Sequence, residues 1–208
     1  MNLKYSYWYF KSALSNHFCD NLIKYANSKK EQIGLTGSIN NEKDVEEEEL
    51  NDLKKKRNSN IVWLDERWLY RYIHHYVNVA NYNSGWNFDW DFSENAQFTK
   101  YKLNQFYDWH CDSWDKPYGE EKNENLKGKI RKLSVTCSLS DPTDYDGGEF
   151  EFKFQNNLDG DIITKKCYEI MPKGSIVVFP SFIYHRVKPV TKGTRYSLVM
   201  WNCGKPFE

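Results

Sequence analysis

Three residues of the sequence could together hold a metal ion. His110 and Asp112 lie two positions apart, and His185 lies far downstream, shortly after the apolar run SIVVFPSF. On an extended chain, residues i and i+2 point to the same side, so an imidazole and a carboxylate at this spacing can reach one metal. A barrel strand could return His185 to the same place. Two imidazoles and one carboxylate leave three positions of an iron ion open, although zinc would accept the same ligands.

A second group of residues could hold a small carboxylic acid. Arg195 follows His185 by ten residues, and Ser197 lies on the same strand face, two positions later. A buried guanidinium offers a rigid fork that matches a carboxylate, and the Ser197 hydroxyl could add a further hydrogen bond. Tyr101 precedes His110 and could donate its phenol to the same acid. A surface ion pair for Arg195 and a core ring for Tyr101 are the alternatives.

The elements that would position these residues change in type along the chain. Apolar residues at helical spacing predict a helix after the N-cap Ser15 and another after Asp65. Between them, the run EKDVEEEELNDLKKKR predicts a mobile charged loop near 41–58, with a lid over substrate as the alternative. Short strands are predicted in four later runs, namely KLSVTCSLS (132–140), GGEFEFKF, SIVVFP and RYSLVMW. This order predicts a mainly β (α+β) barrel or sandwich, buttressed by N-terminal helices.

Composition limits the classes of protein. The 208 residues fit a single domain, and Lys plus Arg equals Asp plus Glu, which argues against nucleic acid or an anionic membrane as partner. Five dispersed cysteines without a Cys-x-x-Cys pair argue against a disulfide framework and a structural zinc site. No apolar run suits a signal peptide or a membrane span. We therefore expect a soluble, cytoplasmic protein.

Order and spacing of these motifs resemble a known family. The stretch from Gln97 to Asp112, then DYDGGEFEF, then FPSFIYHRVKPVTKGTRYSLVMW is similar to the prolyl 4-hydroxylase-like branch of the iron(II)/2-oxoglutarate-dependent oxygenases. Two upstream runs, WYFKSALSNHFCDNLI and WLDERWLYRYI, look like helices that precede the barrel in that family. The resemblance implies one oxygenase domain over 1–208. Within it, 96–208 would form a double-stranded β-helix (jelly-roll) core on a helical support, 1–95.

The resemblance also implies a reaction and its residues. His110, Asp112 and His185 would be the catalytic iron(II) ligands, while Arg195, Tyr101 and Ser197 would bind 2-oxoglutarate. With dioxygen as the other co-substrate, and ascorbate as a supporting reductant, such a dioxygenase hydroxylates a C–H bond and releases succinate and carbon dioxide. Collagen-type members generally carry Lys where this chain has Arg195, and Arg resembles a bacterial and phage-like subgroup instead.

The substrate expected first is a prolyl residue in a peptide or protein. Trp109, Trp114 and Tyr118 lie beside the metal motif and could line a groove for a proline-rich chain. The segment 113–131 reads equally well as a lid and as a polar loop. A free amino acid or other small metabolite is the alternative substrate. A zinc or manganese hydrolase and a non-catalytic metal-binding barrel are the alternative functions, whereas nucleic-acid demethylation lacks a basic stripe with interleaved aromatics.

Overall fold

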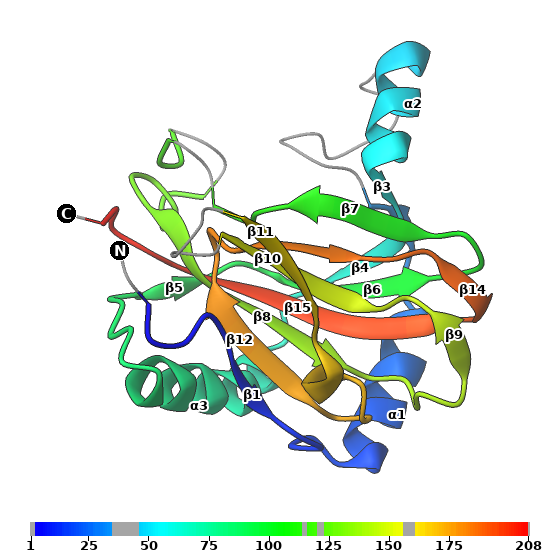
Figure 1. Cartoon of the computed structure of the whole chain (residues 1–208), viewed down its shortest axis with the longest axis horizontal. Coiled ribbons are helices and arrows are strands. Elements are labelled where there is room, and N and C mark those ends of the chain that lie inside the picture. The colour runs from blue at the N-terminus through cyan, green and yellow to red at the C-terminus, as the bar shows by residue number, and fades with distance from the viewer. Residues whose placement is uncertain (1–2, 35–45, 114–115, 120–122, 156–160, 208) are drawn as a thin grey trace.

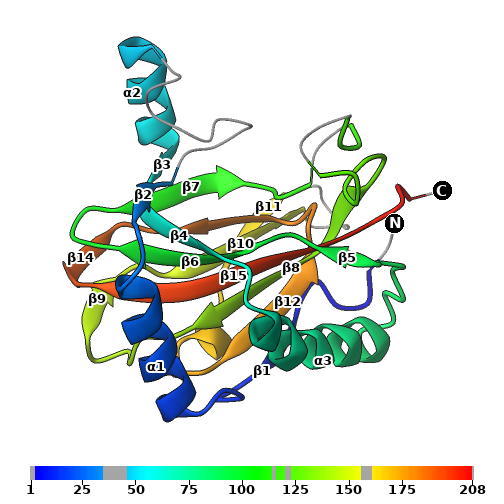
Figure 2. The same cartoon turned by 180° about the vertical axis from the view of Figure 1, so that it is seen from behind.

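Two antiparallel sheets packed face to face form the body of the protein (Figures 1 and 2). The computed structural model describes residues 3–34, 46–113, 116–119, 123–155 and 161–207. The larger sheet has eight strands in the order β1 (Trp8–Phe10), β12 (Ile176–Pro180), β8 (Ile130–Ser138), β15 (Arg195–Gly204), β6 (Ala96–Tyr101), β4 (Asn60–Leu64) and β2 (Gln32–Ile33), with β5 (Phe92–Ser93) paired to β15. The smaller sheet has five, in the order β11 (Ile162–Lys166), β10 (Phe150–Gln155), β13 (Tyr184–Val187), β7 (Phe106–His110) and β3 (Arg57–Asn58).

Short elements complete the described fold. Strands β9 (Tyr145–Gly147) and β14 (Val190–Gly193) form a two-stranded ribbon, and a 3₁₀ turn covers Tyr168–Ile170. The architecture confirms the predicted jelly-roll core with N-terminal helices. In the part of the chain that the structure describes, we find no helix with the length and apolar character that crossing a bilayer requires.

Two helices cover the outer face of the larger sheet (Figure 2). Helix α1 (Asn16–Asn27) begins after Ser15, whose hydroxyl accepts a hydrogen bond from the backbone N–H of Phe18, as the sequence predicted. Helix α3 (Arg67–Asn83) begins after Glu66, one residue later than the predicted start. The buried stripes of both helices join one core with the larger sheet. Its members include Leu22, Ala26, Leu69, Ile73, Val77, Phe98, Leu133, Leu198 and Met200.

The charged run between these helices is not all loop. Residues Glu47–Lys56 form helix α2, and β3 follows it directly. Glu, Leu and Lys are strong helix formers, and basic residues in the last turn interact favourably with the helix dipole. The prediction of a loop over 41–58 is therefore wrong for 47–58. Its first residues, 41–45, lie outside the described part.

Strands from both halves of the chain share the sheets. Strands β1, β2 and β4 precede residue 95 and belong to the larger sheet, and β3 belongs to the smaller one. In particular, β4 pairs along its length with β6, which starts the predicted core. The expected division at residue 95 into helical support and barrel therefore has no counterpart in the strand pairing, because the backbone hydrogen bonds of β6 need β4 as a partner.

A second apolar cluster fills the space between the two sheets. It closes one side of the cavity described below and packs against the ring of Tyr7 from the N-terminal segment. Its buried members are Tyr101, Phe150, Phe152, Cys167, Ile170, Val177, Phe179, Val187 and Val190. The polar residues predicted to act together lie at the edge of this cluster.

Candidate metal centre

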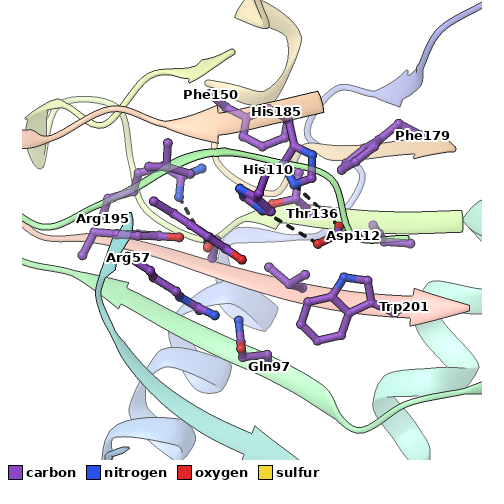
Figure 3. Close-up of a pocket in the computed structure, with 16 residues that line it drawn as sticks. Arg57, Gln97, His110, Asp112, Thr136, Phe150, Phe179, His185, Arg195 and Trp201 are labelled. Carbon is purple, nitrogen blue, oxygen red and sulfur yellow. Dashed lines mark hydrogen bonds and ion pairs between the residues drawn. The ribbon is translucent and has the colours of Figure 1, made fainter. Parts of the chain in front are cut away.

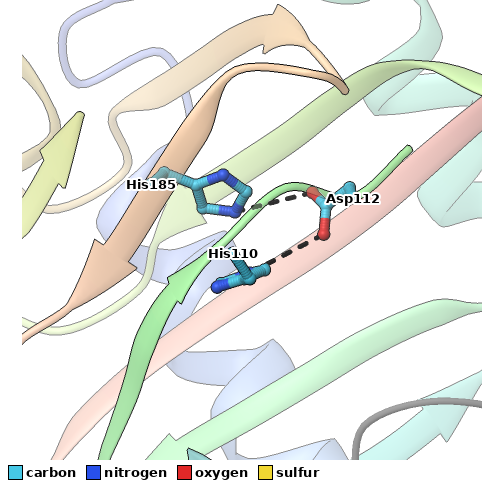
Figure 4. Close-up of side chains that lie close together, drawn as sticks. All are labelled: His110, Asp112 and His185. Carbon is cyan, nitrogen blue, oxygen red and sulfur yellow. Dashed lines mark ion pairs between the residues drawn. The ribbon is translucent and has the colours of Figure 1, made fainter. Parts of the chain in front are cut away.

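The three predicted metal ligands meet at one place. His110 ends strand β7, Asp112 follows two residues later, and His185 lies directly opposite His110 on β13. One possible ligand atom from each side chain lies within 4.8 Å of the others. The His110 Nε2 is 3.8 Å from the Asp112 Oδ1, and the His185 Nε2 is 3.6 Å from the Asp112 Oδ2 (Figure 4). The pairing of β7 with β13 therefore brings His185 close to Asp112, although the two residues are 73 positions apart in the sequence.

Both imidazoles are held in the form that can bind a metal. The His110 Nδ1 lies 2.7 Å from the carbonyl oxygen of Asp108, and the His185 Nδ1 lies 2.9 Å from that of Ile183. A carbonyl can only accept, so each Nδ1 carries a hydrogen, and in the neutral ring the Nε2 keeps the lone pair that binds a metal. Burial, together with the neighbouring His185, lowers the pKa of His110 to about 3. At neutral pH His110 is therefore an uncharged ligand, as metal binding requires.

The carboxylate of Asp112 is supported by two serines that the sequence did not single out. The Ser134 hydroxyl donates to the Asp112 Oδ2 at 2.7 Å and lies 2.9 Å from the Ser181 hydroxyl. The backbone N–H of Asp112 donates to the carbonyl of Ser181 at 2.8 Å. Hydrogen bonds to a buried carboxylate favour its ionised form and fix its orientation. The three side chains thus fit a cation held by two imidazole nitrogens and one carboxylate oxygen.

The predicted carboxylate anchor lies in the same cavity as the metal ligands (Figure 3). Arg195 starts β15 and lies directly opposite Tyr101, the last residue of β6, and both are almost fully buried. The Arg195 Nη1 lies 3.4 Å from the Ser197 hydroxyl. Burial raises the pKa of the Tyr101 phenol, which keeps it protonated and able to donate.

The charge of Arg195 has no acidic partner within the described part of the chain. None of the ion pairs formed by those residues includes Arg195, whose side chain is only 2% exposed. A guanidinium stays charged at any physiological pH, and a buried charge without a counter-ion is costly. An anionic ligand would supply the missing charge. The distal carboxylate of a dicarboxylic acid fits this position, with its other end directed to the metal ligands.

Further residues line the cavity, most of them outside the set predicted from the sequence. The guanidinium of Arg57 lies 4.6 Å from the ring centroid of Tyr107, which in turn stacks on the His110 ring at 3.4 Å. Arg57 ends the charged run that was predicted as a loop. It follows three lysines, and nothing in the local sequence distinguishes it from them. Other lining residues come from both sheets, namely Gln97, Val135, Thr136, Phe150, Phe179, Val187, Val199 and Trp201.

A glycine turn gives Arg195 its space. Gly148 has φ of +62°, and a Cβ atom added there would lie 3.0 Å from the Arg195 Cδ and 3.0 Å from a methyl carbon of Val190. Any larger residue would push against the anchor as well as adopt a disfavoured backbone conformation. The Gly-Gly turn is therefore architectural, because the missing side chain of Gly148 leaves room for the Arg195 side chain.

Trp109, predicted to contact substrate, lies away from the cavity. It neighbours His110 on β7, and successive side chains of a strand point to opposite faces. Its ring lies 4.4 Å from the Lys153 ammonium and 4.5 Å from the Arg186 guanidinium, on the other face of the smaller sheet. A contact with substrate at Trp109 stays a prediction, and it would have to involve a chain that wraps around this sheet.

Tyr118, the second predicted substrate residue, does not line the described walls of the cavity. The Tyr118 phenol donates to the Glu94 carboxylate at 2.9 Å, beside the ion pair of Glu94 with Arg131. Trp114 lies outside the described residues. For both, substrate binding stays a prediction, as does the reading of 113–131 as a lid.

Known proteins resemble this chain in sequence and in fold. The sequence profile of the 2OG-Fe(II) oxygenase superfamily matches residues 96–203. The PKHD-type hydroxylase YbiX of Escherichia coli is 36% identical over 105 residues, which are 50% of this chain and 40% of that protein. The chain thus aligns with less than half the length of this relative.

Solved structures of similar fold cover nearly the whole chain. A viral collagen prolyl hydroxylase from Paramecium bursaria Chlorella virus-1, in complex with 2OG, gives a TM-score of 0.62 at 20% identity, over 97% of both chains. A prolyl-4-hydroxylase from Pseudomonas putida gives 0.63 at 16%, over 98% of this chain and 95% of that one. A Trichoplax adhaerens prolyl hydroxylase, bound to a fragment of hypoxia inducible factor, gives 0.64 at 18%, over 96% and 84%. At these identities the likeness shows the fold.

Proposed function

The chain belongs to the 2OG-Fe(II) oxygenase superfamily, and on that premise we propose that it is an iron(II)- and 2-oxoglutarate-dependent dioxygenase acting on a prolyl residue of a peptide or protein. The observation that carries this proposal is the shared cavity. It contains two imidazoles and a carboxylate at one place, and a buried arginine without an acidic partner among the described residues at another. A simple metal site would need only the first group.

We assign the metal to the Nε2 atoms of His110 and His185 and to the Asp112 carboxylate. This set leaves positions open for a co-substrate and dioxygen, which is the arrangement typical of non-haem iron(II) oxygenases. Iron(II) bound there would activate dioxygen while 2-oxoglutarate is oxidatively decarboxylated to succinate and carbon dioxide, with ascorbate as a supporting reductant. The two backbone carbonyls behind the imidazoles hold the ligand nitrogens in place.

We assign the distal carboxylate of 2-oxoglutarate to Arg195, Tyr101 and Ser197. Arg195 would supply a charged, fork-shaped donor, and the two hydroxyls would add directed hydrogen bonds. Because these groups lie on the paired strands β6 and β15, the backbone ladder fixes their spacing. The anchor therefore orients the co-substrate before any reaction occurs, which is the main contribution that a rigid site makes to such chemistry.

Apolar side chains limit water in the same cavity. Phe150 and Phe179 contact the His185 ring, with centroids 5.6 Å and 4.7 Å away, and Val187 lies next to them. A dry wall beside the metal ligands would strengthen their electrostatic interactions and keep solvent from a reactive intermediate. These residues have no acid–base role in the proposal.

The prolyl substrate is the finer part of the proposal. Structural relatives named as prolyl hydroxylases support it, one of them bound to a peptide fragment. A peptide or protein would then be the partner of this chain. Hydroxylation of a free amino acid or other small metabolite is the alternative, and it would use the same metal and anchor residues.

The test is succinate formation by anaerobically purified protein after addition of iron(II), 2-oxoglutarate and air. Peptides of the (Pro-Ala) and (Gly-Pro-Pro) types are added in parallel, and mass spectrometry detects the gain of one oxygen. We expect turnover in the wild type and in His75→Ala, an exposed histidine on α3, and none in His110→Ala. Absence of succinate from folded, iron-loaded wild-type protein would contradict the oxygenase proposal. Succinate without any peptide product would contradict only the prolyl substrate.

A further inference from the structure

One buried donor in the cavity has no partner. Among the described residues, the indole Nε1 of Trp201 is a buried polar atom without a hydrogen bond, and the side chain is 5% exposed. Trp201 lines the same cavity as the metal ligands. Indole can donate but cannot accept, and a buried donor left unpaired destabilises the fold. A ligand with an oxygen acceptor at this point would remove that cost.

The indole ring is held rigidly by an ion pair. The Arg131 guanidinium lies 4.0 Å from the Trp201 ring centroid. Two nitrogens of Arg131 in turn donate to both carboxylate oxygens of Glu94, each at 2.6 Å. A bidentate pair of this kind fixes the plane of the guanidinium and hence of the ring stacked on it. The direction of the Trp201 N–H is therefore set before a ligand binds.

Trp201 lies at the opposite end of the cavity from the carboxylate anchor (Figure 3). Both residues belong to β15, but six positions separate Arg195 from Trp201, or about 20 Å along an extended strand. Trp201 is the cross-strand partner of Ser134, whose hydroxyl donates to Asp112. A co-substrate held between Arg195 and the metal therefore leaves the Trp201 donor for another ligand.

A second, more exposed indole lies next to Trp201. The Trp63 ring lies 6.2 Å from the Trp201 ring, between centroids, and Trp63 is 39% exposed. Trp63 pairs across strands with Gln97, another lining residue, so both point to the cavity side of the larger sheet. An exposed indole therefore lies beside the buried one.

We propose that Trp201 donates a hydrogen bond from its indole N–H to a backbone carbonyl of the prime substrate, namely the tertiary amide that precedes the target proline. This inference rests on the proposed prolyl substrate. A tertiary amide offers an acceptor and no N–H, which matches an indole that supplies a donor and no acceptor. The two indoles would pack against the apolar faces of a proline-containing chain, as aromatic grooves do.

The direct test is the indole resonance of Trp201 in ¹⁵N-labelled, zinc-loaded protein, with Trp201→Phe used for assignment. Zinc replaces iron so that no turnover occurs. We expect the N–H cross-peak to stay in place on addition of 2-oxoglutarate and to shift downfield on addition of the proline peptide that the iron enzyme hydroxylates. A shift complete with 2-oxoglutarate alone would assign the donor to the co-substrate and overturn the proposal. So would a peptide that binds without moving this peak.

Kinetics separate failure of this inference from failure of the proposed function. In Trp201→Phe, loss of one neutral hydrogen bond should raise the KM for peptide by about 3- to 10-fold. The KM for 2-oxoglutarate should change less than the KM for peptide. Trp68→Phe, on the exposed face of α3, is the matched control. An unchanged peptide KM would overturn the role of Trp201 alone, whereas no hydroxylation of any peptide by the wild type would remove the prolyl substrate and this inference with it.

Discussion

The two ends of the cavity are built differently. At the metal end, His110 and His185 lie on the smaller sheet, and their Nδ1 atoms and the Asp112 carboxylate all have partners within the protein. At the anchor end, Arg195 lies on the larger sheet with a full charge, with the Ser197 hydroxyl beside it and no acidic partner among the described residues.

This difference separates a preformed site from one that depends on its ligand. Neutral imidazoles and a hydrogen-bonded carboxylate are tolerated in the interior without a metal. A buried guanidinium without an anion is not stabilised in this way, and its burial cost is recovered only when a carboxylate binds. The metal end should thus contribute to the fold in either state, whereas the anchor end should oppose it until 2-oxoglutarate arrives.

The largest expected effect is at the metal end. His110→Ala removes one of three ligands, and we expect metal affinity and succinate formation to fall by more than about 100-fold, beyond the loss typical of supporting residues. Metal content after dialysis and succinate release measure the two effects. Wild-type metal content in a folded His110→Ala protein would show that the metal lies elsewhere. His75→Ala serves as the control.

The next effect contrasts stability with binding at the anchor end. Arg195→Met should raise the KM for 2-oxoglutarate by about 10- to 100-fold, since it removes a charged hydrogen-bond donor. The same change should leave the unliganded protein as stable or more stable, because it removes an unpaired buried charge. Urea unfolding with and without 2-oxoglutarate measures both.

Arg186→Met is the matched change on the outer face of the smaller sheet, where Arg186 pairs with Glu151 at 2.7 Å. It should lower stability slightly and leave 2-oxoglutarate binding unchanged. If Arg195→Met instead destabilised the unliganded protein by several kcal/mol, as breaking a buried ion pair does, the contrast between the two ends would be lost.

A smaller effect tests the serine behind the metal ligands. Ser134→Ala removes the hydroxyl that orients Asp112, and metal affinity should fall by roughly 10-fold, the lower limit for residues that support a ligand. The KM for 2-oxoglutarate at saturating metal should change little. Ser140→Ala, which removes a hydroxyl bonded to the backbone of Tyr196, is the control. Equal metal affinity in both variants would contradict the role given to Ser134.

The smallest effect concerns the turn behind the anchor. Gly148→Ala should cost about 1–2 kcal/mol of stability because of its positive φ, and it should raise the KM for 2-oxoglutarate a few-fold by displacing Arg195. Gly128→Ala has the same backbone strain, with φ of +73° and no atom near the added Cβ. It should therefore lose stability without any change in KM. Identical KM values in the two variants would show that Gly148 acts on the fold alone.

The sequence predicted those parts of the site that depend on local order. The i, i+2 spacing of His110 and Asp112, and of Arg195 and Ser197, places each pair on one side of a strand, and the structure brings them into one cavity. The same alternation would have directed Trp109 away from His110, to the face where its ring lies between two cations. Local rules were therefore sufficient for these residues.

Other parts depend on which strands become neighbours. Ser134 supports Asp112 only because β8 lies next to the residues that follow β7. Trp201 lies beside Ser134 only because β8 pairs with β15. No local pattern distinguishes Ser134 from the other polar strand residues. Arg57 was missed for another reason, because charged composition suits both a helix and a loop, and only the turn into β3 buries this residue.

The hydrogen bonds behind the two imidazoles have a consequence for variation among sequences. In each case the acceptor is the main-chain carbonyl two residues before the histidine, at Asp108 for His110 and at Ile183 for His185. The proton position on each ring is thus set by the path of its own strand, and the side chains at 108 and 183 take no part in it. Both positions are free to diverge without altering the metal-binding form of either histidine, and each three-residue segment could be transplanted with its tautomer intact.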